Sequence, residues 1–308
     1  MTVAASSRAD PARTPWLTRE RVIAIRRPLT TLVVIVAGWE ILARTVLTNP
    51  LFFAPPSEVA LAAVRLWESG ELQRHIAVSF SELIYGVLLA IGVGTAIGVV
   101  VGISHRVRGY TEVYITALYA TPLVAVTPLL ILWLGIGIAS KIAVVFLTAV
   151  FPILINTVAG VRSTEALLIE VAQSFCATRG QIIAKVMLPS ALPFILTGIR
   201  LGIGRGIVGV VVGELFGAQA GLGFLIYTAG QTFDVPSLFV GIVTLAIAGV
   251  GLTFAAELVE RRVLRWRRTN SMLRFSTATA AACGLMLNPT GWFAASAARA
   301  ARRARPQT

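Results

Sequence analysis

The chain has 308 residues, of which 56% are hydrophobic and only 13% are charged, and its mean hydropathy is +0.81. Soluble domains carry about 25% charged residues, so this composition excludes an ordinary soluble protein and indicates several membrane spans. The net charge of +13 does not indicate a nucleic-acid-binding protein, because the basic residues flank apolar segments and do not form one face. Two cysteines and two histidines are too few and too scattered for a disulfide framework or a metal site.

Six apolar segments are long enough to cross a membrane, which takes roughly 20 residues. They lie near residues 28–47, 79–103, 113–134, 138–160, 191–216 and 237–258. We therefore predict an all-α, polytopic membrane protein. The first segment follows an Arg-rich stretch, as in a signal peptide, but its apolar run is too long for a cleaved signal, so we expect it to be retained. Prolines in the third and fourth segments are expected to bend those helices: Pro122, Pro128 and Pro152.

The distribution of Lys and Arg predicts the orientation. With the N-terminus inside, the inside segments hold 21 of these residues and the outside segments hold 2. We therefore expect a protein of the cell (plasma) membrane with both termini in the cytoplasm. Residues 1–27 would be a cytoplasmic tail and residues 28–268 the transmembrane domain. Residues 269–308 form a basic, Ala-rich tail that is expected to be disordered or to lie on anionic membrane lipid.

A short amphipathic helix is predicted over residues 57–75, on the outer surface between the first two spans. Ser57 follows two prolines and belongs to the residue types that cap a helix N-terminus. Glu58 is favourable near the same helix end, because the helix dipole is positive there.

The connection between the fourth and fifth spans, residues 161–190, is long and does not have the composition of a turn. Its pattern predicts two short helices. Thr164 and Glu165 can start the first, Gly180 is placed to end it or to change the chain direction, and Pro189 is expected to end the second, over residues 181–187. The apolar residues of this protrusion require a partner protein or, alternatively, the bundle of the chain itself.

This connection resembles the "EAA" loop of binding-protein-dependent ABC importer permeases. That loop has Glu-x-Ala, a Gly six residues after the Glu, an aliphatic residue, and then Leu-Pro. Glu170, Ala172, Val186, Leu188 and Pro189 match without a gap, whereas Cys176 stands at the Gly position. The resemblance covers about residues 55–268 and indicates the sulfonate/nitrate/taurine branch. It extends to further segments: Pro55-Pro56-Ser57, Gly198–Leu201, Val212–Gly217 and Gly221-Leu222-Gly223.

The resemblance implies that the loop docks on a separate ATP-binding subunit and carries the movement of that subunit into the spans. The implied coupling residues are Glu170, Ala172, Cys176, Gly180, Leu188 and Pro189. Glu170 would make a charged contact, and the small Ala172 and Cys176 would allow close approach. A homodimer and an extracytoplasmic solute-binding protein are implied as well. The transported solute is expected to be small, an anion such as a sulfonate or nitrate, moved inward by alternating access.

The chain has no Gly-x4-Gly-Lys-Ser/Thr phosphate loop, so it is predicted not to be an enzyme and to bind no cofactor. ATP and Mg would be bound by the partner subunit.

The fifth span contains three ionisable residues, Arg200, Arg205 and Glu214, which are costly in lipid and usually functional. Glu214 cannot pair with either arginine, because they lie about 21 Å and about 13.5 Å away along the helix. Arg200 can reach the cytoplasmic interface, and Glu214 can be hydrated at the outer end. Arg205 could contact an anionic substrate or pair across a dimer interface, so Arg205 and Glu214 are the candidate pathway residues. The alternative function is a secondary transporter or channel without an ATPase. Such a protein would be expected to have several ion-coupling carboxylates at mid-membrane, whereas we identify one candidate carboxylate, Glu214.

Overall fold

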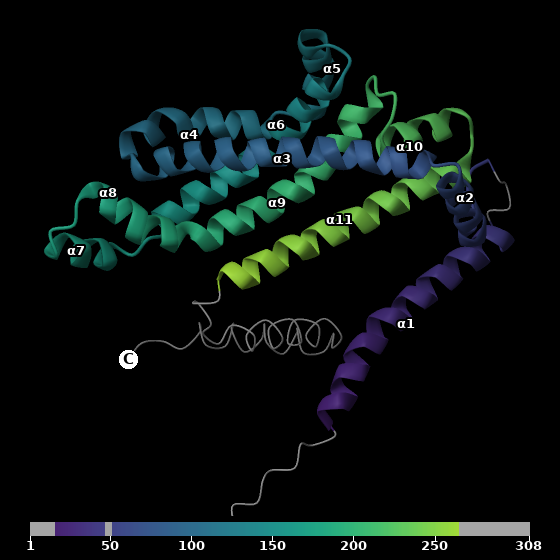
Figure 1. Ribbon diagram of the computed structural model, residues 1–308, viewed down its shortest axis with the longest axis horizontal. Helices are drawn as coiled ribbons and strands as arrows, with labels where there is room; N and C mark the ends of the chain where they lie inside the picture. The colour runs from purple at the N-terminus through teal and green to yellow at the C-terminus, as the bar shows by residue number, and fades with distance from the viewer. Residues whose placement is uncertain (1–15, 47–50, 265–308) are drawn as a thin grey trace, which may run out of the picture. The chain divides into compact units, whose positions relative to one another are not determined.

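The computed structural model describes residues 16–46 and 51–264, and only the course of the backbone in residues 16–29. In these ranges the chain is helical and has no strand, which confirms the all-α prediction. The elements are α1 (Trp16–Thr45), α2 (Pro56–Glu68), α3 (Glu71–Ile103), α4 (His105–Ala120), α5 (Leu123–Leu134), α6 (Ile138–Arg162), α7 (Ala166–Ser174), α8 (Arg179–Ile182), the π-helical turn η1 (Ile183–Met187), α9 (Leu188–Leu215), α10 (Leu222–Gln231) and α11 (Val235–Val263) (Figure 1).

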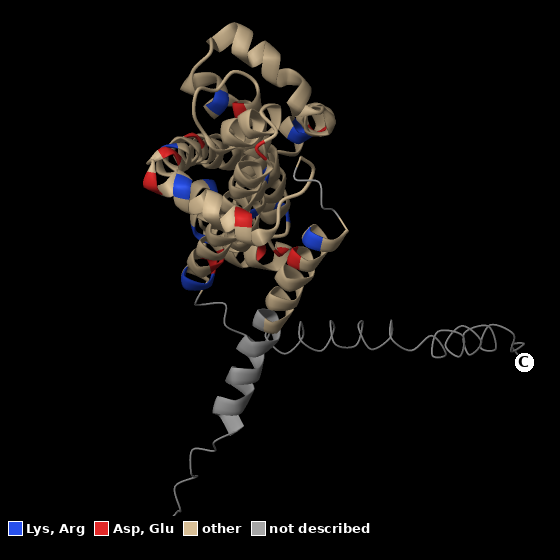
Figure 2. Cartoon of the chain, turned by 90° about the vertical axis from the view of Figure 1, so that its right-hand side faces the viewer, with Lys and Arg blue, Asp and Glu red and all other residues tan. Residues whose placement is uncertain are grey.

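Four helices in the described residues are long and apolar enough to cross a membrane: α3, α6, the continuous helix formed by α8, η1 and α9, and α11. The helices α4 and α5 qualify as a fifth span only when they are taken together. Charged residues are sparse along the helices (Figure 2). The predicted span at 28–47 coincides with α1, which begins earlier, at Trp16, so part of the predicted N-terminal tail is helical. The predicted tail at 269–308 lies outside the described residues.

The predicted continuous helix over residues 113–134 is wrong, because α4 and α5 meet at an angle of 93°. Thr121, between them, has an extended backbone with ψ of 131°. It precedes Pro122, whose ring crowds the helical conformation of the residue before it. The other two prolines lie inside helices, Pro128 in α5 and Pro152 in α6.

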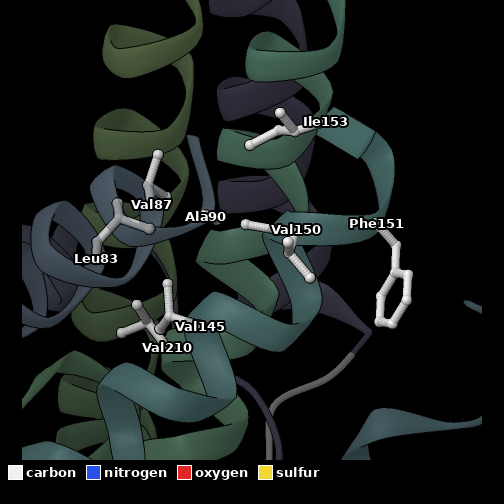
Figure 3. Close-up of a cluster of buried hydrophobic side chains, with 9 residues drawn as sticks. Leu83, Val87, Ala90, Val145, Val150, Phe151, Ile153 and Val210 are labelled. Atoms are coloured by element: carbon white, nitrogen blue, oxygen red, sulfur yellow. The ribbon is translucent and has the colours of Figure 1, made fainter. Parts of the chain in front are cut away.

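The centre of the bundle is formed by α3, α6 and α9. Figure 3 shows the main apolar cluster, to which α3 contributes Leu83 and Val87, α6 contributes Val145 and Ile153, and α9 contributes Val210. Glycines bring these helices close together. A Cβ atom added to Gly98 would lie 2.6 Å from Thr157 Cβ, and one added to Gly198 would lie 2.8 Å from Asn156 Cβ. Small residues at these positions therefore let the helix backbones approach closely.

The helix predicted over residues 57–75 is two elements. The first element, α2, ends at Glu68. Gly70 then takes a left-handed backbone with φ of +80°, and the second element, α3, begins at Glu71. Ser57 is not a cap, because Pro55 occupies the N-cap position. Instead, the Ser57 hydroxyl and backbone N–H donate to the carboxylate of Glu40 in α1. Trp39 Nε1 donates to Ala54 O at 3.1 Å, so α1 is fixed to the segment that leads into α2.

Candidate functional site

The predicted coupling residues lie along one protrusion of the bundle. Its first helix is α7, and Glu165 occupies the N-cap position, as predicted. Gly180 lies within α8, and Leu188 and Pro189 are the first two residues of α9. Glu170 is exposed, whereas Ala172 is half-buried. The protrusion lies at one end of α9, opposite the end from which α10 follows (Figure 1).

The reversal between α7 and α8 occurs at Phe175–Thr178, so the prediction that Gly180 ends the first helix is wrong. Cys176 takes a left-handed backbone with φ of +54°. The Cys176 N–H donates to Gln173 O, and the Ala177 N–H donates to Ala172 O. These two hydrogen bonds form a Schellman motif, which most often uses Gly at this position. We call Phe175–Thr178 the α7 turn.

The start of α8 completes the α7 turn. The Gln181 N–H donates to Thr178 Oγ1, and the Thr178 N–H donates to Gln181 Oε1 at 2.8 Å. This reciprocal pair is a capping box. The backbone of the α7 turn is therefore satisfied by local hydrogen bonds, which leaves its apolar side chains free for a partner.

Pro189 does not end the second helix of the protrusion, contrary to prediction, because the helix runs without a break from Arg179 to Leu215. A proline inside a helix lacks an N–H donor and crowds the preceding turn. The π-helical turn η1 ends at Met187, two residues before Pro189, and widens the helix there. The chain therefore passes Pro189 as a helix, and the protrusion is joined directly to a membrane span.

Most of the apolar side chains of α7 are exposed. No residue of α7 is buried. Leu167 and Val171 are exposed, and the Phe175 side chain at the end of α7 is 84% exposed. The structure therefore does not bury this helix against its own bundle, which was the alternative. Leu167, Val171 and Phe175 form an apolar surface at the tip of the protrusion.

Arg205 lies on α9 and lines a cavity of about 290 Å³. Tyr119, Thr121 and Pro122 reach this cavity from the break between α4 and α5, and Thr148 reaches it from α6. Arg205 is exposed and makes no hydrogen bond or ion pair with any residue that the structure describes. Its guanidinium can therefore contact a bound anion. Glu214 does not line this cavity.

Glu214 is only 1% exposed, so it is not hydrated at a helix end. Its carboxylate accepts hydrogen bonds from the Ser79 hydroxyl, at 2.6 Å, and from the Gly223 N–H at the start of α10. A carboxylate is favourable at a helix N-terminus. A Cβ atom on Gly221, which has φ of +129°, would collide with the Glu214 carboxyl group.

Two α3 side chains accept the neighbouring N–H groups of the same turn. His75 Nδ1 accepts from Gly221 N at 2.9 Å, and Ser79 Oγ accepts from Leu222 N at 2.7 Å. Together with Glu214, these side chains satisfy three successive backbone donors. We call Gly221–Gly223 with His75, Ser79 and Glu214 the α10 cradle. It explains the Gly221-Leu222-Gly223 pattern and joins α3, α9 and α10.

Two further ionisable residues were missed by sequence analysis. Glu82, in α3, is 1% exposed, and Lys141, in α6, is 8% exposed. Lys141 Nζ lies 3.3 Å from Glu82 Oε1. The sequence did indicate each residue separately, as an acid inside the predicted span at 79–103 and a lone lysine at the start of the span at 138–160. Their pairing depends on the tertiary structure.

Comparisons with known proteins identify the family. Residues 89–265, more than half of the chain, match the binding-protein-dependent transport system inner membrane component. The chain is 38% identical, over 77% of its length and 86% of the relative, to the putative aliphatic sulfonates transport permease protein SsuC of Bacillus subtilis (strain 168). It is 32% identical, over 86% of its length and 98% of the relative, to the taurine transport system permease protein TauC of Escherichia coli (strain K12).

The fold is that of solved importer structures. A chain of the MetNI methionine ABC transporter, in an inward facing conformation, has a TM-score of 0.59 and 20% identity, over 64% of this chain and 97% of that one. The family implies an ATP-binding subunit and a solute-binding protein as partners, and it excludes the alternative of a secondary transporter or channel. The chain thus belongs to the inner membrane components of binding-protein-dependent transport systems and is the multi-pass permease subunit of an ATP-driven importer, a transport component and not an enzyme.

Proposed function

We propose that this permease imports a small organic anion of the sulfonate class. The observation that carries the proposal is Arg205, an unpaired guanidinium that lines the cavity at the break between α4 and α5. The names of the two relatives, an aliphatic sulfonate permease and a taurine permease, support the same solute class. An unpaired positive charge within a span is costly in lipid and usually faces a water-filled path or another protein.

The same argument supports a homodimer with the pathway between its two copies. Leu201, Gly204, Arg205 and Val208 are all exposed and recur at helical spacing on one face of α9. This face is apolar except for Arg205, so it can pack against protein but faces lipid only at high cost. A second copy of the chain would cover its apolar residues and enclose the guanidinium in the path of the solute.

The α7 protrusion is proposed to dock on the ATP-binding subunit, through the exposed apolar tip and the charged side chain of Glu170. We propose accordingly that the protrusion and both termini lie in the cytoplasm of a plasma-membrane protein, as the distribution of Lys and Arg predicts. ATP and Mg would be bound by the partner subunit, and this chain would bind no cofactor. Ala172 and Cys176 would allow the backbone of the protrusion to approach the partner closely.

The assignment can be tested in proteoliposomes that contain the importer complex, with uptake of a radiolabelled alkanesulfonate as the measurement. Arg205→Met should lower uptake at least tenfold, because a charge-assisted contact to the anion is lost, while the ATP-binding subunit still co-purifies. Arg106→Met, at an exposed position at the start of α4, is the control. Unchanged uptake by Arg205→Met would contradict the anion contact.

Docking is tested separately by co-purification of the ATP-binding subunit. Ala172→Arg should abolish co-purification without changing membrane insertion, because a bulky charged side chain prevents close approach. Normal co-purification would contradict docking through α7.

A further inference from the structure

Three ionisable side chains meet inside the bundle near the α10 cradle. Glu82 from α3, Lys141 from α6 and Glu214 from α9 are each at least nine-tenths buried. Ser79, one turn before Glu82 on α3, donates to the Glu214 carboxylate, and Lys141 Nζ lies 3.3 Å from Glu82 Oε1. A Cβ atom added to Gly213, next to Glu214, would lie 3.5 Å from Lys141 Cα, so the three side chains are neighbours. With every group ionised, this triad would hold two negative charges and one positive charge.

Among the described residues, no further charged side chain lies beside the triad: on α9, Arg205 and Arg200 are about 13.5 Å and about 21 Å from Glu214 along the helix. The helices α5 and α10 contain no charged residue, and neither does α11 between Val235 and Ala256. The charged side chains of α2 are exposed. His75 lies on the same helix as Glu82, but its Nδ1 accepts the Gly221 N–H. An uncompensated buried charge is strongly unfavourable, so the triad must gain a positive charge or lose a negative one.

The hydrogen bonds of the two carboxyl groups differ. Both oxygens of Glu214 accept a hydrogen bond, one from Ser79 and one from Gly223, which is the arrangement that favours an ionised carboxylate. Neither oxygen of Glu82 receives a hydrogen bond from a described residue. A protonated Glu82 would need no further donor, and its own O–H could be donated to Glu214.

We propose that Glu82 and Glu214 hold one proton between them, so that the Glu82–Glu214–Lys141 triad is a neutral, proton-binding site. The proton is shared by the two carboxyl groups, the pair keeps one negative charge that binds the start of α10, and Lys141, which contacts Glu82, balances that charge. Loss of the proton places two adjacent negative charges in the interior and weakens the junction of α3, α6 and α9.

The test compares the thermal unfolding of the purified permease, wild type and variants, across pH. Glu82→Gln copies the protonated acid, and Glu68→Gln, at an exposed position at the end of α2, is the matched control. Above about pH 4.3, an unfolded chain releases a Glu proton that the folded wild type retains. The unfolding equilibrium constant of the wild type should therefore rise by up to about tenfold per pH unit relative to Glu82→Gln, until the folded protein also releases its proton. Glu68→Gln should follow the wild type.

A second measurement does not depend on any variant folding. Infrared spectra of the wild type at neutral pH should contain the carbonyl band of a protonated carboxylic acid, and Glu82→Gln should lack it. Absence of this band in the wild type would overturn the proposal, as would the same pH profile for wild type and Glu82→Gln. Replacement of Na⁺ and K⁺ by choline at constant ionic strength should leave stability unchanged, and a loss of stability would show that a metal cation, not a proton, balances the triad.

Discussion

The α7 turn and the α10 cradle lie at opposite ends of one helix and satisfy their backbones in different ways. In the α7 turn, the hydrogen bonds come from residues within a few positions in the chain, and the side chains remain exposed. In the α10 cradle, they come from side chains more than a hundred positions away in α3, and from Glu214. Local bonding leaves a surface available for a partner, whereas long-range bonding makes a junction that cannot be changed without loss of stability.

The largest effect is expected from Gly221→Ala, which breaks the α10 cradle. A Cβ atom at this position meets the buried Glu214 carboxyl group, and the backbone has φ of +129°, so we expect a loss of about 3 kcal/mol in the free energy of unfolding. Thermal unfolding in detergent would measure it. Gly92→Ala is the matched control, because a Cβ atom there meets nothing within 4 Å. Equal unfolding temperatures for the two variants would contradict the cradle.

A smaller loss, about 2 kcal/mol, is expected from Ser79→Ala. The Ser79 hydroxyl donates to Glu214 Oε1 and accepts from the Leu222 N–H, so its removal takes a hydrogen-bond partner from both of these buried groups. Ser81→Ala provides the comparison, because the Ser81 hydroxyl donates only to Val78 O in its own helix. The difference in unfolding temperature between the two variants is the measurement. If Ser81→Ala is as destabilising as Ser79→Ala, the hydrogen bonds between α3 and α10 do not stabilise the α10 cradle.

The smallest effect is expected at the α7 turn and has the opposite sign. Cys176→Gly should stabilise the protrusion by about 1 kcal/mol, because Gly adopts the left-handed backbone that Cys176 is forced to adopt. Amide hydrogen exchange of Val171–Phe175 would detect the change as slower exchange. Ser174→Gly, two residues earlier and at the end of the right-handed helix α7, should have faster exchange. Slower exchange in both variants would show that the backbone of Cys176 is not the cause.

Sequence reasoning located the spans and the protrusion because both depend on local pattern. Apolar segments predict helices wherever they occur, and the spacing from Glu170 to Pro189 is independent of tertiary structure. The sequence also has Cys176 at the position where the family usually has Gly. The structure shows that Cys176 nevertheless takes the left-handed backbone of this turn. Gly180 and Pro189 were misassigned because the Schellman motif and the π-helical turn are set by backbone hydrogen bonds that residue preferences do not specify.

The α10 cradle and the triad could not be predicted in the same way. Glu214 appeared solvent-accessible because its position near a helix end was known but its neighbours were not. Its partners Ser79 and Gly223 are separated from it by 135 and 9 positions. Lys141 and Glu82 come together only after α3 and α6 have packed through their glycines. Such contacts follow from the tertiary structure, and no spacing rule within one segment predicts them.

The unbroken helix from Arg179 to Leu215 has a mechanical consequence. At 1.5 Å per residue, its 37 residues form a lever about 55 Å long, with the α7 protrusion at its base and Glu214 at its far tip. Because no break separates the protrusion from the span, a displacement of the protrusion moves the whole helix. A movement imposed on the α7 protrusion would therefore be carried along this helix to the α10 cradle at its other end.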